Sequence, residues 1–150
     1  MIRLTPRMLV VLLTTVAHGM LVLHSFAAAP KTDREAIRAT VTDYIEGYYT
    51  GDAQRMERSL HPHYLKHTIS GSGEQLKMSE WTGLQMVESV KTSGTPNPST
   101  SERKEDITVL DVSGDIASAK LVTTHWTDYM TLTKWDNHWK IVSVVLRETD

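Results

Sequence analysis

The last third of the chain constrains the fold most strongly, because residues 116–147 alternate strand-forming and polar side chains with almost no interruption. Within this stretch the pair Asp136-Asn137 separates two strand-like runs, and both residue types tolerate the left-handed backbone conformation of a tight hairpin turn. Residues 113–115 mark a second turn. We therefore predict a series of antiparallel strands over residues 106–112, 116–126, 128–135 and 139–146.

The first half of the chain begins with a pattern typical of a long helix. Thr32 is followed three residues later by Glu35, which is the capping-box arrangement of a helix start. Gly51 fits the end of this helix, because glycine adopts the left-handed cap conformation at little cost. The apolar residues between these points have the spacing of one buried helix face, and they are Ile37, Val41, Tyr44, Ile45 and Tyr48.

Three shorter elements are predicted between the long helix and the strands. Asp52 can cap a second short helix, which ends before Pro62 because proline restricts the residue that precedes it. A short strand follows over residues 64–69. A third helix is expected over about residues 79–90, where apolar residues recur at helical spacing.

This order of elements predicts an α+β fold with helices first and adjacent strands afterwards. We expect a cone-shaped, curved antiparallel sheet wrapped around the N-terminal helices. A helix that lies inside a bent sheet leaves an opening between them. That opening is the expected small-molecule pocket of the chain.

The composition limits what the domain can do. The chain has 150 residues, about the length of one domain, with 40% hydrophobic and 23% charged residues. Its formal net charge of −2 and its scattered basic residues argue against a nucleic-acid partner. It has no cysteine, which excludes thiolate nucleophiles and cysteine-based metal sites.

The N-terminal segment has the features of a signal peptide. Arg3 and Arg7 precede an apolar run over residues 8–23, and Ser25 and Ala27 then supply small residues at the positions that a signal peptidase inspects. We expect a signal peptide at residues 1–27, cleavage after Ala27, and an exported domain, periplasmic or secreted, at residues 28–150. The alternative is a retained anchor, but the apolar run is shorter than the roughly 20 residues of a spanning helix. No stable membrane insertion is expected after cleavage.

Five short segments, in this order and spacing, carry a resemblance to a known family: residues 44–52, 60–62, 80–81, 128–132 and 139–142. Together they resemble the putative lumazine-binding family of the nuclear-transport-factor-2-like superfamily, which also contains ketosteroid isomerase and polyketide cyclases. The resemblance covers about residues 33–147. It implies the cone-shaped fold, a flat pterin-like ligand, and a homodimer formed through the outer faces of the sheets.

Enzymatic function is the alternative hypothesis. The resemblance implies a comparison with isomerases of this superfamily, which use a carboxylate base placed after the second helix. Residues 63–69 of this chain contain no carboxylate. His67 could replace it, since imidazole titrates near neutral pH. Asp128, between Trp126 and Tyr129, could be an acid with a raised pKa. An isomerase, cyclase or dehydratase would then use His67 or Asp128 for proton transfer.

The histidines are not expected to bind a metal. His61, His63 and His67 are separated by two and four residues, and His125 could join them from the sheet. Pro62 interrupts their regular geometry, and no neighbouring carboxylate completes a ligand set. No cofactor is expected either.

Aromatic side chains from different elements are the stronger candidates for ligand contact, because their flat apolar faces stack on rings. The main hypothesis is therefore an exported small-molecule-binding domain with an aromatic-lined pocket. Its predicted ligand-binding residues are Tyr48, Tyr64, His67, Trp81, Trp126, Asp128 and Tyr129.

Overall fold

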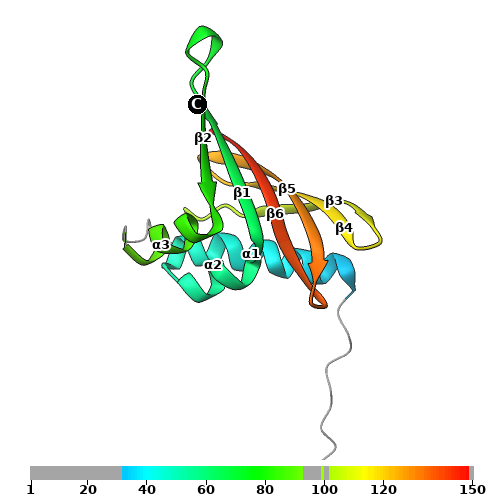
Figure 1. Cartoon of the computed structure of the whole chain (residues 1–150). Helices are drawn as coiled ribbons and strands as arrows, with labels where there is room; N and C mark the ends of the chain where they lie inside the picture. The colour runs from blue at the N-terminus through cyan, green and yellow to red at the C-terminus, as the bar shows by residue number, and fades with distance from the viewer. Residues whose placement is uncertain (1–31, 93–98, 100–101, 149–150) are drawn as a thin grey trace, which may run out of the picture.

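A computed structural model describes residues 32–92, 99 and 102–148, so the predicted signal peptide at residues 1–27 lies outside the described residues. The helices are α1 (Asp33–Thr50), α2 (Ala53–Ser59) and α3 (Gly83–Thr92), with a 3-10 turn, η1 (Gly73–Gln75). The strands are β1 (Leu60–Ser70), β2 (Lys77–Thr82), β3 (Asp106–Ser113), β4 (Ile116–Val122), β5 (Trp126–Trp135) and β6 (His138–Glu148). All three helices lie on one side of a curved sheet, as predicted (Figure 1). No helix in these ranges is long and apolar enough to cross a bilayer.

The long helix α1 begins and ends where the sequence predicts. The side chain of Thr32 accepts from the backbone N–H of Glu35, and the Glu35 carboxylate accepts from the backbone N–H of Thr32 at 2.8 Å. Gly51 ends the helix with a φ of 71°. The buried face of α1 packs on the inner face of the sheet, and the core between them includes Ile37, Val41, Ile45, Leu121, Leu132 and Ile141.

The sheet has the strand order β2-β1-β6-β5-β4-β3. Every neighbouring pair is antiparallel except β1 and β6, which run parallel, so the sheet is mixed and the expectation of a wholly antiparallel sheet is corrected. After β2 and α3 the chain crosses to the far edge, adds β3 to β5 as hairpins and returns with β6 beside β1. The predicted hairpin turn is confirmed, since Asp136 and Asn137 have φ values of 49° and 62°.

The third helix starts later than its apolar spacing indicates. Residues 77–82 form strand β2, which pairs with β1 from Leu65↔Thr82 to Ser70↔Lys77. The helix begins at Gly83, after a second capping box in which Gln85 accepts from the Thr82 backbone N–H at 2.8 Å and donates its own backbone N–H to Thr82. The predicted start at residue 79 was wrong because the free edge of β1 recruits this segment by hydrogen bonding. Local spacing does not contain that information.

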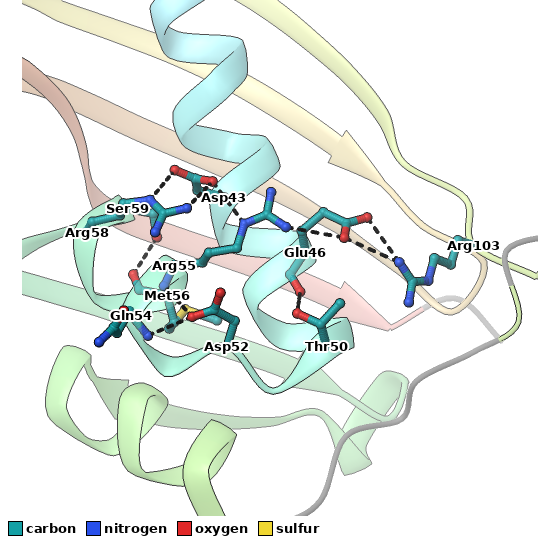
Figure 2. Close-up of polar contacts among 10 residues, drawn as sticks. All are labelled: Asp43, Glu46, Thr50, Asp52, Gln54, Arg55, Met56, Arg58, Ser59 and Arg103. Atoms are coloured by element: carbon teal, nitrogen blue, oxygen red, sulfur yellow. Dashed lines mark hydrogen bonds and ion pairs between the residues drawn. The ribbon is translucent and has the colours of Figure 1, made fainter.

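A network of ion pairs joins α1 to α2 and to the segment before β3. Figure 2 shows Arg55 and Arg58 reaching Asp43, at 3.0 and 2.7 Å. Glu46 lies within 3.4 Å of Arg55 and 3.3 Å of Arg103. The two acids of α1 therefore hold both neighbouring segments in place beside the helix.

Glu105 borders this network and gives it a pH dependence. Burial, and then a hydrogen bond and repulsion from Glu46, raise the pKa of Glu105 from 4.5 to about 7. A carboxyl group whose pKa is higher in the folded state destabilises the fold as pH rises, here from 4.5 through 7.

We therefore expect Glu105→Gln to stabilise the fold by about 1 kcal/mol at pH 8, a value reduced for solvent screening, and to have little effect at pH 5. Urea unfolding at the two pH values measures this difference, with Glu74→Gln at an exposed position as the matched control. Equal effects of Glu105→Gln at both pH values would contradict the assignment.

Candidate functional site

The candidate site is a cavity of about 340 Å³ between the concave face of the sheet, α1 and α3. It lies where the resemblance and the order of elements predict a pocket. Its lining residues come from α1, α3 and the strands β1, β2, β5 and β6. The residues that line it are Tyr44, Ile45, Tyr48, Lys66, Thr68, Trp81, Met86, Ser89, Val90, Trp126, Leu146 and Glu148.

Aromatic side chains form much of the wall. The rings of Tyr48 and Trp126 pack edge to face, with centroids 5.7 Å apart and an interplanar angle of 88°. Trp81, on edge strand β2, is 39% exposed while it lines the cavity. An exposed indole at the mouth and packed rings inside form a slot suited to a flat, partly apolar molecule.

One end of the cavity is polar, where Lys66 of β1 pairs with Trp81 of β2. Alternation along β1 places Tyr64, Lys66 and Thr68 on the inner face of the sheet. The buried Lys66 donates a hydrogen bond from Nζ to the Tyr44 hydroxyl at 3.0 Å. The Tyr64 hydroxyl lies 3.4 Å from the same oxygen. Because an ammonium group carries three N–H donors, Lys66 retains donors for a ligand acceptor.

Asp128 lies beside this polar end. It pairs with Leu146 of β6, which pairs in turn with Thr68 of β1, and both of these partners line the cavity. Its side chain is 0% exposed. Oδ2 accepts from the Trp126 indole Nε1 at 3.0 Å, whereas Oδ1 has no hydrogen-bond partner among the described residues.

Burial controls the protonation of these groups. Desolvation raises the pKa of Asp128, and the nearby Lys66 opposes part of that rise. Desolvation also lowers the pKa of Lys66, against the attraction of Asp128. Burial and the neighbouring Tyr64 and Asp128 keep the pKa of Tyr44 well above its ordinary value. The apolar surroundings therefore bring the neutral forms of Lys66 and Asp128 closer in energy to the charged pair.

The structure separates the predicted site residues into two groups. Tyr48, Trp81 and Trp126 line the cavity, whereas Tyr64 and Asp128 are buried and contact the lining residues Tyr44 and Trp126. His67 and Tyr129 are not among the lining residues. His67 Nε2 lies 3.8 Å from Glu80, and Tyr129 is 53% exposed beneath the Lys120 ammonium.

Sequence reasoning missed Lys66 altogether and assigned Tyr44 to the core. The strand period of two was a usable signal, because Tyr64 and Thr68 flank Lys66 on the same face. No group of three potential metal ligands occurs in the part of the chain that the structure describes. The backbone N–H of His63 instead donates to Nδ1 of His61 at 3.1 Å.

A second hollow of about 640 Å³ lies between α2, α3 and the hairpin of β5 and β6. Trp135 and Leu84 border it, together with charged residues from the helix surfaces and Lys140. Among the described residues, Trp135 is the one tryptophan or tyrosine in its lining, whereas Tyr44, Tyr48, Trp81 and Trp126 line the first cavity. The aromatic cavity is therefore the better candidate for a specific site.

The family described as "Putative lumazine-binding" matches residues 32–147, and the chain belongs to this family. No curated protein matches the chain. An NTF2-like protein from Shewanella baltica is similar in structure, with a TM-score of 0.67 and 21% identity over 81% of this chain and 99% of its own. One from Methylobacillus flagellatus has a TM-score of 0.64 and 18% identity over 82% and 97%.

A third NTF2-like protein, from Novosphingobium aromaticivorans and described as having a cystatin-like fold, has a TM-score of 0.55 and 14% identity over 79% of this chain and 82% of its own. These likenesses establish the NTF2-like fold, in agreement with the resemblance seen in the sequence.

Proposed function

We propose that this chain is an exported small-molecule-binding domain whose aromatic cavity takes a flat, partly apolar, pterin-like molecule. The observation that supports this function is the combination of stacking surfaces with a buried cation. Trp81 and Trp126 offer ring faces or edges, while Lys66 retains N–H donors at the polar end. A heteroaromatic ring with carbonyl oxygens on one edge can stack on these tryptophans and accept a hydrogen bond from Lys66.

The description of the family supports lumazine as the first probe. The fused rings of lumazine are flat, and its two carbonyl oxygens are hydrogen-bond acceptors. A carbonyl directed at Lys66 would gain a charge-assisted hydrogen bond in surroundings that exclude water, where such bonds are strongest. The cavity volume of about 340 Å³ falls within the size range of small-molecule sites.

Trp81→Ala tests the stacking contribution. We expect lumazine to bind the variant about tenfold more weakly, since stacking of a ring on an aromatic side chain contributes about 1–3 kcal/mol. Trp135→Ala is the matched control, because Trp135 is a similarly exposed indole, 46%, that borders the second hollow. Calorimetric titration measures both affinities. Weaker binding by Trp135→Ala, with Trp81→Ala unchanged, would move the site to the second hollow.

Asp128 supports a second candidate function, an isomerase, cyclase or dehydratase that moves a proton. A buried carboxyl group with one unpartnered oxygen and a raised pKa, next to a ligand cavity, fits a general acid or base. His67 is less suited to that role, because it lies on the opposite face of β1 from Lys66, where its Nε2 is 3.8 Å from Glu80. Deuterium exchange at the α-carbon of 2-tetralone, followed by NMR, tests this activity. Exchange that Asp128→Asn abolishes would support the enzyme, and exchange no faster than in buffer would exclude it for this probe.

We also propose that two copies associate through the outer face of the sheet. Tyr129 of β5 pairs directly with Val145 of β6, and both are exposed there, 53% and 43%. Light scattering after size-exclusion chromatography should give the mass of a dimer, and Val145→Glu should give the mass of a monomer.

Export can be tested in the same preparation, because the intact mass of the protein reports whether residues 1–27 have been removed.

A further inference from the structure

We propose that Lys66 forms a covalent imine with a carbonyl compound that enters the cavity. The ligand class would be small aromatic or conjugated aldehydes and ketones. This inference rests on the proposed function, because it requires a cavity that admits small molecules. It goes beyond reversible binding by assigning a nucleophile.

The position of Lys66 supports this chemistry. Its side chain is buried yet lines the cavity, so a bound carbonyl carbon can approach the amine while water is largely excluded. The walls of the cavity are aromatic and would hold a conjugated carbonyl in place. A lysine that is desolvated in an apolar pocket is a recognised form of activated nucleophile.

The groups around Lys66 can accept and donate the protons that imine formation requires. The Tyr44 hydroxyl lies 3.0 Å from Nζ, and the Tyr64 hydroxyl is the next group in the chain of contacts. Asp128 is the carboxylate that interacts electrostatically with Lys66, and its Oδ1 has no hydrogen-bond partner among the described residues. Oδ1 is therefore an available acceptor for the ammonium proton.

The reaction balances with these residues and a bridging water. A proton passes from the Lys66 ammonium to the Asp128 carboxylate through the bridging water, because the two side chains are not in hydrogen-bond contact, and this leaves a neutral amine and a neutral carboxylic acid. The amine nitrogen attacks the carbonyl carbon, and a proton moves from nitrogen to the former carbonyl oxygen to give a carbinolamine. Asp128 then protonates the hydroxyl group, water leaves, and a C=N bond forms. The product is an iminium ion paired with the Asp128 carboxylate, plus one water molecule.

The lowered pKa of Lys66 is consistent with this step. Each unit by which a lysine pKa falls gives about tenfold more neutral amine at neutral pH. The exposed Lys91 and Lys104 have neighbouring acids at 2.8 and 3.5 Å, but neither lines the aromatic cavity. Imine formation should therefore be selective for Lys66 at low carbonyl concentration.

The test uses benzaldehyde as the probe and sodium cyanoborohydride, which reduces any imine to a stable secondary amine. Peptide mapping by mass spectrometry then locates the added benzyl group. We expect labelling of Lys66 to be at least about tenfold faster than labelling of the exposed Lys77 on β2. Lys66→Arg, which keeps the positive charge, should remove the fast label, and Asp128→Asn should slow it.

Lumazine separates the possible failures, because its amide-like carbonyls do not condense with amines. If lumazine binds the cavity but benzaldehyde labels all lysines equally, the imine proposal is overturned and the proposed function stands. Fast labelling of Lys66 without lumazine binding would support imine formation and would contradict the proposal of a pterin-like ligand. If neither occurs, both proposals fail. Circular dichroism of Lys66→Arg and Asp128→Asn confirms that the variants tested are folded.

Discussion

Replacing Lys66 by methionine should destabilise the fold by about 2 kcal/mol at pH 8, because it removes the cation whose attraction partly offsets the burial of the Asp128 carboxylate. The loss should be much smaller at pH 5. Burial already raises the pKa of Asp128, and removal of Lys66 raises it further. A carboxyl group with a raised folded-state pKa costs stability as pH rises above its unfolded value of 3.8, so the deficit grows with pH.

Urea unfolding at pH 5 and pH 8 measures this effect, and Lys77→Met on the exposed strand β2 is the matched control. The double variant Lys66→Met with Asp128→Leu should recover most of the lost stability at pH 8, since an apolar pair replaces the unpaired charge. A loss below about 1 kcal/mol at both pH values would mean that the two groups do not depend on each other.

Trp126→Ala should cost about 3 kcal/mol of folding free energy and also weaken lumazine binding. The substitution removes a ring that packs on Tyr48 and Tyr49, and large-to-small changes of tryptophan cost about 3–5 kcal/mol when the site is fully buried. It also removes the indole N–H that donates to Oδ2 of Asp128, so that neither oxygen of this buried carboxyl group has a hydrogen-bond partner among the described residues.

Trp126→Phe separates these two contributions. It keeps an aromatic ring beside Tyr48 but removes the donor, and a loss of about 1–3 kcal/mol is expected from the hydrogen bond to Asp128. Trp81→Ala is the contrasting variant, because Trp81 lines the same cavity from an exposed edge strand. It should weaken binding with little change in stability. Equal stabilities of Trp126→Ala and the unaltered protein would contradict the role given to this ring.

Local signals made much of the fold predictable. The hairpin at Asp136-Asn137 and both ends of α1 depend on residues close together in the sequence, and all are confirmed. The parallel pairing of β1 with β6 depends on contacts between residues more than 70 positions apart. The strand conformation of residues 77–82 depends on pairing with the edge of β1, which exists only once β1 has formed. No local pattern specifies these features.

The candidate site was predictable in its apolar half. Aromatic residues such as Trp81 and Trp126 were expected at a pocket, and they line it. Lys66 was overlooked because an unpaired lysine is normally exposed. Alternation shows that Lys66 and His67 occupy opposite faces of β1, but only packing against α1 decides which face is inner. The roles of His67 and Tyr129 in binding therefore remain predictions without support from the geometry of the cavity.

The chain has four tryptophans, whose indole N–H groups give four separate signals in a nitrogen–proton correlation spectrum. Titration with lumazine, with each signal assigned by substitution, tests the central claim most directly. Trp81 and Trp126 line the aromatic cavity, whereas Trp135 borders the second hollow and Trp139 lies in the core. We predict saturable shifts of the Trp81 and Trp126 signals, with Trp135 and Trp139 unchanged. Shifts confined to Trp135, or no shift of any indole, would contradict a binding site in this cavity.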